Sequence, residues 1–141
     1  MKKTIRLAAV LLATTVLPVA AQSDVLMGER LYQENCASCH GANLEGQPDW
    51  RTRLPNGKLP APPHDASGHT WHHPDRVLLD IVKRGPAAIV GNGYESDMPG
   101  YKDVLTDDEI TAIIDYIKSR WPNRIRASQE SRSLADEQAQ P

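Results

Sequence analysis

Apolar side chains recur three and four residues apart in three stretches of the chain, and this spacing predicts three helices. The first helix is expected from about Asp24 to Asn35, with Ser23 or Asp24 as its cap. The second is expected from about Pro74 to Arg84, and Gly85 ends it. The helical positions are Val25, Gly28, Leu31, Tyr32 and Cys36 in the first stretch and Val77, Leu78, Ile81 and Val82 in the second.

The third helix carries the clearest signals. Thr106 and Glu109 have the spacing of a capping box, in which each side chain accepts a hydrogen bond from the other residue's backbone N–H. Acidic residues fill the first turn, and Lys118 and Arg120 stand at the end, as the helix dipole favours. Pro122 prevents continuation. The apolar stripe consists of Ile110, Ile113, Ile114 and Ile117.

Two long stretches between these helices, residues 41–73 and 86–100, show neither helical nor strand periodicity and are rich in Gly and Pro. Loops of this length in a small domain usually have a function or wrap around a ligand. After Pro122 the chain is polar, and we expect a frayed tail over residues 123–141 with a short helix over 123–131. The predicted fold class is therefore all-α.

The first 21 residues have the pattern of a secretory signal peptide. Lys2, Lys3 and Arg6 precede an apolar run over residues 7–17, and small residues allow cleavage after Ala21. The alternative is a membrane anchor, but the run is shorter than the ~20 residues that a membrane span needs. We expect cleavage near Ala21 and export to the periplasm.

The remaining chain is acidic and has few large side chains for a core. Cleavage removes three of the 16 basic groups, which leaves 13 against 18 acidic groups and a formal charge of −5. This charge disfavours nucleic acid and anionic lipid as partners and suits a positively charged protein. The chain has no Phe and only three Trp, so a large apolar prosthetic group would help to fill the core.

Both cysteines of the chain lie in the sequence Cys36-Ala37-Ser38-Cys39-His40. This C-x-x-C-H pattern is typical of c-type haem attachment, because two thiols at this spacing reach the two vinyl groups of one porphyrin and the next residue offers an imidazole to the iron. A disulfide would not account for His40. A zinc site would need further thiols or well-spaced histidines.

With this motif, the chain resembles class I c-type cytochromes over about residues 24–122. Gly28 and Tyr32 precede Cys36 by eight and four residues, and "DMPGY" stands ahead of the last predicted helix. The resemblance implies a class I cytochrome c fold, with three main helices and long loops around one covalent haem c, as a domain over residues 22–122. It also implies that Gly28 and Tyr32 pack against an aromatic residue of the last helix, here Tyr116.

His40 and Met98 are the expected iron ligands. The resemblance places the distal ligand at Met98, and a thioether favours ferrous iron and so raises the reduction potential. The alternative is a Met that fills a gap in the core. A proline carbonyl should accept the second N–H of His40, with Pro60, Pro62 and Pro63 as candidates. Residues 45–58 look like an insertion relative to compact members of the family.

Four histidines follow this segment, at positions 64, 69, 72 and 73. The first interpretation is structural: they cap the second helix and donate hydrogen bonds, and Trp71 with one histidine reaches the haem propionates. The second is a copper or zinc site. The third is that one of them replaces Met98 on the iron. The sequence favours the structural role, because no regular ligand spacing includes all four.

The resemblance implies a periplasmic one-electron carrier and not an enzyme. Two alternatives stay open: the electron-accepting cytochrome subunit of a periplasmic dehydrogenase or oxidase, and a metal-handling or sensing module that uses the cluster from His64 to His73. The expected partners are redox proteins with a basic docking patch. We expect no membrane span in the mature chain of this protein. The residues expected around the haem edge are Glu34, Glu45, Glu95, Asp97 and Asp103, with Lys102 as the one base close by.

Overall fold

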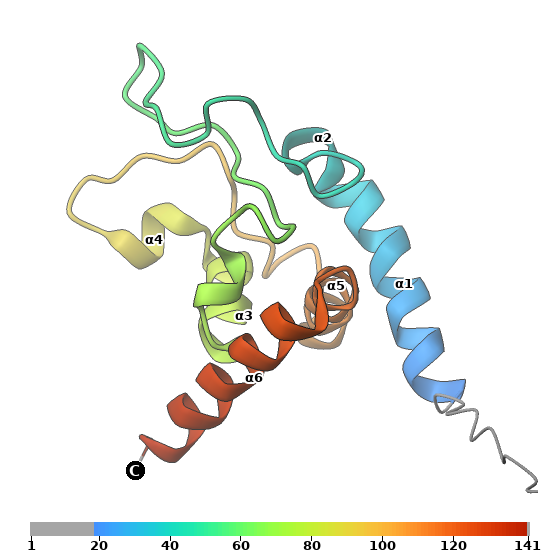
Figure 1. The fold of residues 1–141 in the computed structure, drawn as a ribbon. Helices are drawn as coiled ribbons and strands as arrows, with labels where there is room; N and C mark the ends of the chain where they lie inside the picture. The colour runs from blue at the N-terminus through green and yellow to red at the C-terminus, as the bar shows by residue number, and fades with distance from the viewer. Residues whose placement is uncertain (1–18, 141) are drawn as a thin grey trace, which may run out of the picture.

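The computed structural model describes residues 19–140, with side chains from Asp24 onward; residues 1–18 of the expected signal peptide lie outside this range. The described residues form helices and loops without a strand, which confirms the predicted all-α class. None of these helices is both long enough and apolar enough to cross a membrane. The elements are α1 (Val19–Asn35), α2 (Ala37–His40), η1 (Thr70–His72), α3 (Asp75–Arg84), α4 (Pro86–Val90), α5 (Asp107–Ser119) and α6 (Asn123–Gln138) (Figure 1).

The crossing of α1 and α5 is the main helix–helix contact of the fold. Gly28 makes it possible: a Cβ on this residue would lie 1.9 Å from the carbonyl oxygen of Ala112, so only glycine lets the two backbones approach this closely. One turn further on, the rings of Tyr32 and Tyr116 pack with their centroids 5.5 Å apart. The expected packing of Gly28 and Tyr32 on the helix that carries Tyr116 is confirmed.

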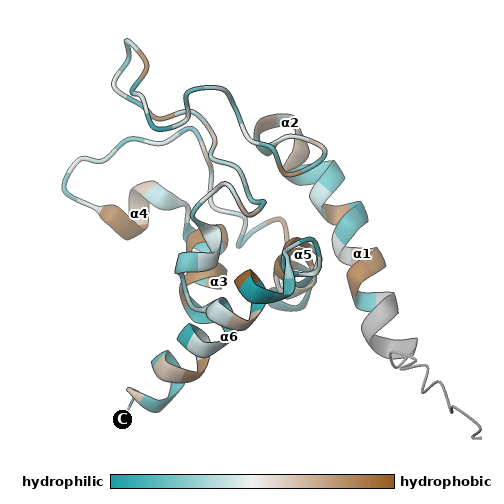
Figure 2. Ribbon diagram, in the orientation of Figure 1, coloured by the Kyte–Doolittle hydropathy of each residue, from teal (hydrophilic) through white to brown (hydrophobic). Residues whose placement is uncertain are grey.

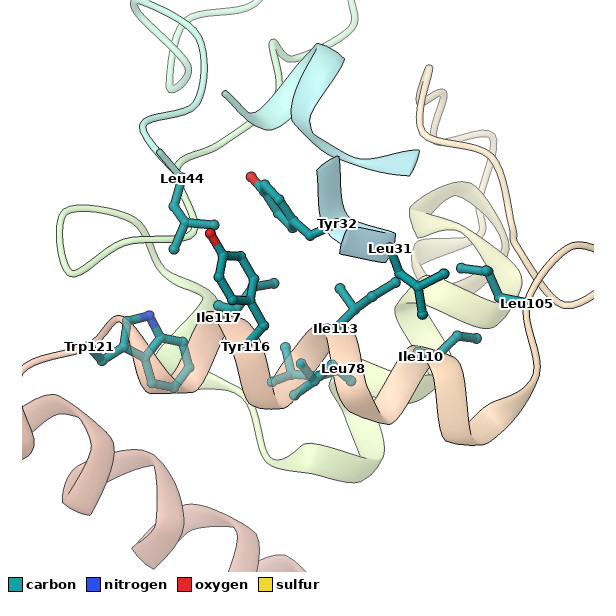
Figure 3. Close-up of a cluster of buried hydrophobic side chains, with 11 residues drawn as sticks. Leu31, Tyr32, Leu44, Leu78, Leu105, Ile110, Ile113, Tyr116, Ile117 and Trp121 are labelled. Carbon is teal, nitrogen blue, oxygen red and sulfur yellow. The ribbon is translucent and has the colours of Figure 1, made fainter. Parts of the chain in front are cut away.

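A compact apolar cluster forms where α1, α3 and α5 meet (Figure 3). The predicted stripe of α5 supplies much of it, since Ile110, Ile113, Ile114 and Ile117 are all buried. Leu78 of α3 and Leu44 of the loop after α2 also belong to the cluster. Burial of each such side chain contributes about 1.5–3 kcal/mol to folding. The cluster therefore fixes α1, and with it the Cys36–His40 segment, relative to α5.

The predicted capping signals are present in the structure. The Thr106 hydroxyl accepts a hydrogen bond from the N–H of Glu109 at 3.3 Å, and the Glu109 carboxylate accepts one from the N–H of Thr106 at 2.9 Å. Helix α3 begins at Asp75, directly after Pro74, and ends at Gly85, whose φ of 78° suits glycine. The second and third predicted helices are therefore confirmed to within a few residues.

Two parts of the chain are more helical than the sequence predicted. Residues 86–90, expected as loop, form the single-turn helix α4. The expected fraying after Pro122 is wrong, and the short helix expected over residues 123–131 is longer than predicted: residues 123–138 form α6, which packs against η1. Figure 2 shows that α6 carries mostly hydrophilic residues. Its buried positions are Gln129 and Ser133, so it has no apolar stripe that periodicity could detect.

Candidate functional site

The two cysteines and the histidine of the C-x-x-C-H motif lie in one tight turn. Cys36 stands between α1 and α2, and Cys39 and His40 belong to α2. The N–H of His40 donates to the carbonyl of Cys36 at 2.9 Å, which closes one helical turn around the motif. The two thiols form no disulfide; Cys39 is exposed and Cys36 is half-buried. Burial raises the pKa of the Cys36 thiol to about 11. This thiol is therefore protonated at neutral pH, and the turn presents two unbridged sulfurs beside one imidazole.

The His40 ring is buried and its tautomer is defined by one contact. Its Nδ1 lies 2.8 Å from the carbonyl oxygen of Pro62, which can only accept, so Nδ1 carries the proton and donates it. Nε2 is then the unprotonated nitrogen that is able to bind a metal. Burial lowers the pKa of His40, and the bond to Pro62 opposes this shift. Of the three candidate prolines, the structure selects Pro62; Pro60 is buried nearby in the chain but does not make this bond.

The ring of His64 packs on one face of the His40 ring. The two imidazoles stack with centroids 4.0 Å apart and an interplanar angle of 23°. His64 is itself held by Thr70, whose Oγ1 lies 2.7 Å from its Nδ1, and by Trp121, whose Nε1 donates to its carbonyl oxygen at 2.7 Å. Burial lowers the pKa of His64 well below its ordinary value. The first of the four histidines is thus a neutral packing partner of His40.

Met98 lies half-buried in an irregular segment, residues 91–101, which we call the Met loop. Its N–H donates to the Ser96 hydroxyl at 3.2 Å. At the end of the loop, the Tyr101 hydroxyl donates to the carbonyl of Asn35 at 2.8 Å, next to Cys36. A Cβ on Gly85 would lie 3.1 Å from the carbonyl oxygen of Met98. The loop is therefore fixed between the end of α3 and the residue before the attachment motif.

Trp71 has an unusual environment in η1. Its Nε1–H is buried and has no hydrogen-bond partner among the described residues. A buried indole N–H without an acceptor is costly, so this donor fits an acceptor that comes from a bound group. A haem c needs two thiols for its thioethers and an imidazole nitrogen for its iron, and its propionates need hydrogen-bond donors. The site offers Cys36 and Cys39, Nε2 of His40, and the N–H of Trp71. The residues present fit that group.

The other three histidines contact aromatic rings. His69 stacks on Trp50 at 5.4 Å and meets His73 edge-on at 5.6 Å, and the ring of His72 lies 3.9 Å from that of Trp71. Within residues 24–140, no three His, Cys, Asp or Glu side chains converge as they would around a metal ion. These ring contacts agree with a structural role, but the expected capping of the second helix is wrong. Pro74 precedes α3 without a side-chain cap, and the N–H of Asp75 donates to Ser133 Oγ at 3.0 Å.

The acidic side chains expected at the haem edge have more basic neighbours than the sequence suggested. Glu34 pairs with Arg30 at 3.0 Å, and Asp97 pairs with Lys58 of the inserted segment. Lys102, the one base expected there, lies 3.3 Å from Asp103. The expectation of a single close base is therefore wrong. Arg30 follows from helical i, i+4 spacing, but Lys58 is 39 residues from Asp97, and nothing in the local sequence connects them.

Known proteins resemble the chain over short segments. The cytochrome c subunit of the cytochrome bc1 complex of Mycobacterium tuberculosis (strain H37Rv) is 48% identical over 46 residues, which cover 30% of this chain and 16% of that protein. The subunit of the same name in Mycobacterium bovis has the same values. Cytochrome c-555 of Prosthecochloris aestuarii is 43% identical over 42 residues, or 26% of this chain and 42% of that protein. The chain thus spans less than half the length of each of these relatives. No solved structure matches it significantly.

A family comparison covers much more of the chain. The model of the family described as cytochrome c matches residues 25–121. This range begins at Val25 in α1 and ends at Trp121. It therefore includes the motif turn, Pro62, the Met loop and α5. The chain therefore belongs to the cytochrome c family, and its cofactor is a covalently bound haem c.

Proposed function

We propose that this protein is an exported one-electron carrier in which Cys36 and Cys39 hold the haem as thioethers and His40 and Met98 ligate its iron. The observation that carries the assignment is the bond from Nδ1 of His40 to Pro62, which leaves Nε2 as the metal-binding nitrogen. When bound, the haem accepts and releases one electron at its iron. The chain itself supplies ligands, burial and orientation, as an electron-transfer protein does and not as an enzyme.

Each residue has a separate task in this proposal. Pro62 holds the His40 ring and makes its Nε2 a better donor. Met98 offers a soft sulfur that favours the ferrous state and raises the potential. With His40 and Met98 both bound to the iron, the protein would leave no position for oxygen to bind. Trp71 would donate its unpaired N–H to a haem propionate.

Intact mass of the denatured native protein tests attachment and export together. We expect the mass of residues 22–141 plus one haem, in a periplasmic fraction. A mass without haem contradicts the attachment, and a mass that retains residues 1–21 contradicts the cleavage near Ala21. Changing Cys36 and Cys39 to Ala should abolish covalent haem.

Replacement of Met98 tests the distal ligand. In Met98→Ala the reduced protein should bind carbon monoxide readily, whereas the wild type should bind it slowly. NMR of the reduced wild type should show a Met methyl signal shifted far upfield by the haem ring. If that signal is absent and the variant keeps the wild-type spectrum, Met98 is not the ligand and a histidine of residues 64–73 is the next candidate.

The partner is proposed to be a redox protein with a basic docking patch. The formal charge of −5 that the chain would have after cleavage at Ala21 supports this, as do the exposed carboxylates of Glu45 and Glu95. The pairing of Glu34, Asp97 and Asp103 with basic residues reduces the acidic excess at the rim. Stopped-flow reduction by a basic partner should slow as salt rises, because screening sets in over ~8 Å at physiological ionic strength. A rate that does not fall with salt contradicts the acidic docking surface.

The second candidate is a cytochrome subunit of a larger redox complex. It is favoured by the relatives named as cytochrome c subunits of the bc1 complex. Purification from the native host at low ionic strength distinguishes the two. A free carrier elutes as a small monohaem protein, and a subunit elutes with its partner in fixed ratio.

A further inference from the structure

The inserted segment, residues 45–58, and the Met loop form opposite walls of one open pocket. The pocket has a volume of about 390 Å³. Arg53, Asn56 and Gly57 line it from the insert, and residues 90–95 line it from the other side. Figure 1 shows the insert as the loop that extends furthest from α6, beyond the chain that follows α4.

Two side-chain contacts close the distance between these walls. Lys58 Nζ donates to the Asp97 carboxylate, directly beside Met98. The guanidinium carbon of Arg53 lies 6.0 Å from the centroid of the Tyr94 ring, at the outer limit of a cation–π contact. The hydrogen bond to Asp97 and then the charge of Asp97 raise the pKa of Lys58, and the charge of Glu95 adds a smaller effect in the same direction.

The other end of the insert is fixed to the proximal side of the site. The N–H of Gln47 donates to the carbonyl of Ala61 at 2.9 Å, next to Pro62. A Cβ on Gly46 would lie 2.4 Å from the nitrogen of Pro63, so the two backbones touch. Trp50 stacks on His69. The insert therefore connects the carbonyl that holds His40 to the loop that carries Met98.

The Met loop has little support of its own. Among the described residues, 95–100 take part in no backbone–backbone hydrogen bond. Three successive residues before them, Gly91, Asn92 and Gly93, have positive φ values of 66°, 51° and 77°, a conformation that a non-glycine residue adopts at a cost. Side-chain contacts therefore restrict this segment. The Ser96 hydroxyl accepts from the Met98 N–H within the loop, and the Lys58–Asp97 pair links the loop to the insert beside Met98.

We propose that Lys58 is a positioning residue for Met98: through its ion pair with Asp97, the insert holds the Met loop against the haem and slows loss of the Met98–iron bond. This inference rests on the proposed ligation by Met98. An exposed ion pair contributes little to global stability. Its effect here is local, because opening of a poorly bonded loop requires far less free energy than unfolding.

The test compares Lys58→Met with Lys83→Met. Lys83 pairs with Asp107 at 2.8 Å with similar exposure, 33% against 26% for Lys58, but lies at the end of α3 and not on the insert. We measure the rate at which the oxidised protein binds cyanide, which requires displacement of the Met ligand. Lys58→Met and Asp97→Asn should each speed binding by about two- to fivefold, the range of exposed ion pairs. The double variant should be no faster than either single variant, and Lys83→Met should match the wild type.

Two further readouts separate this proposal from that of Met98 ligation. The oxidised wild type should show the charge-transfer absorption of a Met–iron bond, and its absence contradicts the ligation. NMR order parameters of the amides of residues 95–98 should fall in Lys58→Met whatever the ligand is. If both the cyanide rate and the order parameters equal those of Lys83→Met, Lys58 does not position the loop. Recovery in the exchanged pair K58D/D97K supports the ion pair as the cause.

Discussion

At His40, one backbone carbonyl and one stacked ring decide what the side chain can do. The Pro62 carbonyl accepts a hydrogen bond from Nδ1–H at 2.8 Å, and the His64 ring stacks on one face of the His40 ring with centroids 4.0 Å apart. Burial alone would already keep the ring neutral, because it lowers the pKa of His40. The contact with Pro62 selects the tautomer with the proton on Nδ1, and both contacts fix the orientation of the ring. Nε2 is therefore unprotonated and fixed in orientation before any iron binds.

Trp71 offers the sharpest test at the scale of one residue. Trp71→Phe keeps most of the ring and removes the buried Nε1–H, which has no partner among the described residues. If this N–H donates to a haem propionate, its loss costs about 1.5–3 kcal/mol, as for hydrogen bonds to charged groups. The propionate pKa should then rise by about one to two units. A pH titration of the reduction potential measures this shift, and Trp121→Phe, whose N–H donates to the His64 carbonyl, is the matched control. Equal titration curves for Trp71→Phe and wild type contradict the role.

At the scale of helices, the α1–α5 crossing depends on one missing side chain. Gly28→Ala places a Cβ 1.9 Å from the Ala112 carbonyl oxygen unless the helices separate. Overpacking of this kind costs about 1–3 kcal/mol, more than the about 0.5–1 kcal/mol that alanine gains over glycine within a helix. Chemical denaturation should show a net loss of stability. Glu29→Ala, at an exposed position of the same helix, should change stability little. A Gly28→Ala protein as stable as wild type would mean that the crossing is looser than described.

Helix α6 is docked by polar groups, and Gln129 is the central one. Its Nε2 lies 2.6 Å from Asp75 Oδ1, 3.1 Å from Ser133 Oγ and 3.2 Å from the carbonyl oxygen of His73. Gln129→Ala removes the donor from all three acceptors. Asp75 keeps its bond from Lys118, and Ser133 keeps the bond from the Asp75 N–H, so the His73 carbonyl is the acceptor left without a partner. We expect a loss of about 1–1.5 kcal/mol in the free energy of unfolding. Glu130→Ala, on the exposed side of α6, is the control. Equal stability of the two variants would show that α6 does not depend on this network.

Whether a helix could be predicted from the sequence depended on whether it buries apolar or polar side chains. Helices α3 and α5 have apolar stripes and clear end signals, so their bounds were readable from periodicity. Helix α6 buries Gln129 and Ser133 in place of apolar residues, and hydropathy therefore described it as a solvated tail. Helix α4 has five residues between two glycines, too short for any period to appear.

For the whole molecule, the sequence could predict those parts of the site that lie in one local motif. The grouping of Cys36, Cys39 and His40 follows from spacing alone, and Met98 as the distal ligand is still a prediction from the resemblance to a family. The choice of Pro62 among neighbouring prolines depends on how residues 41–63 fold back over the motif turn. The Lys58–Asp97 pair joins two irregular segments. Such contacts result from tertiary packing, and no local pattern encodes them.

The histidine segment gives the whole molecule a pH dependence with a defined sign. Burial lowers the pKa of His64, His69 and His73 below the ordinary value of 6.5. Below about pH 6.5 the unfolded chain binds more protons at these histidines than the folded chain does. Their contribution to the free energy of unfolding is therefore complete above about pH 6.5 and decreases as the pH falls below it. Solvent screens the charges of the exposed His69 and half-buried His73, so their contributions are smaller than that of a fully buried group.

Asp115 acts in the opposite direction, because burial raises its pKa and favours the folded state in acid. The prediction is therefore differential. Between about pH 7 and pH 5.5 the free energy of unfolding of the wild type should fall, and in the variant with His69→Gln and His73→Gln it should fall less steeply. Exposed His72→Gln is the matched control. Denaturant unfolding over a pH series measures the slopes. Equal slopes in wild type and double variant would mean that both rings become protonated as easily in the folded protein as in the unfolded chain, and that their contacts with Trp50 and with each other do not oppose a charge.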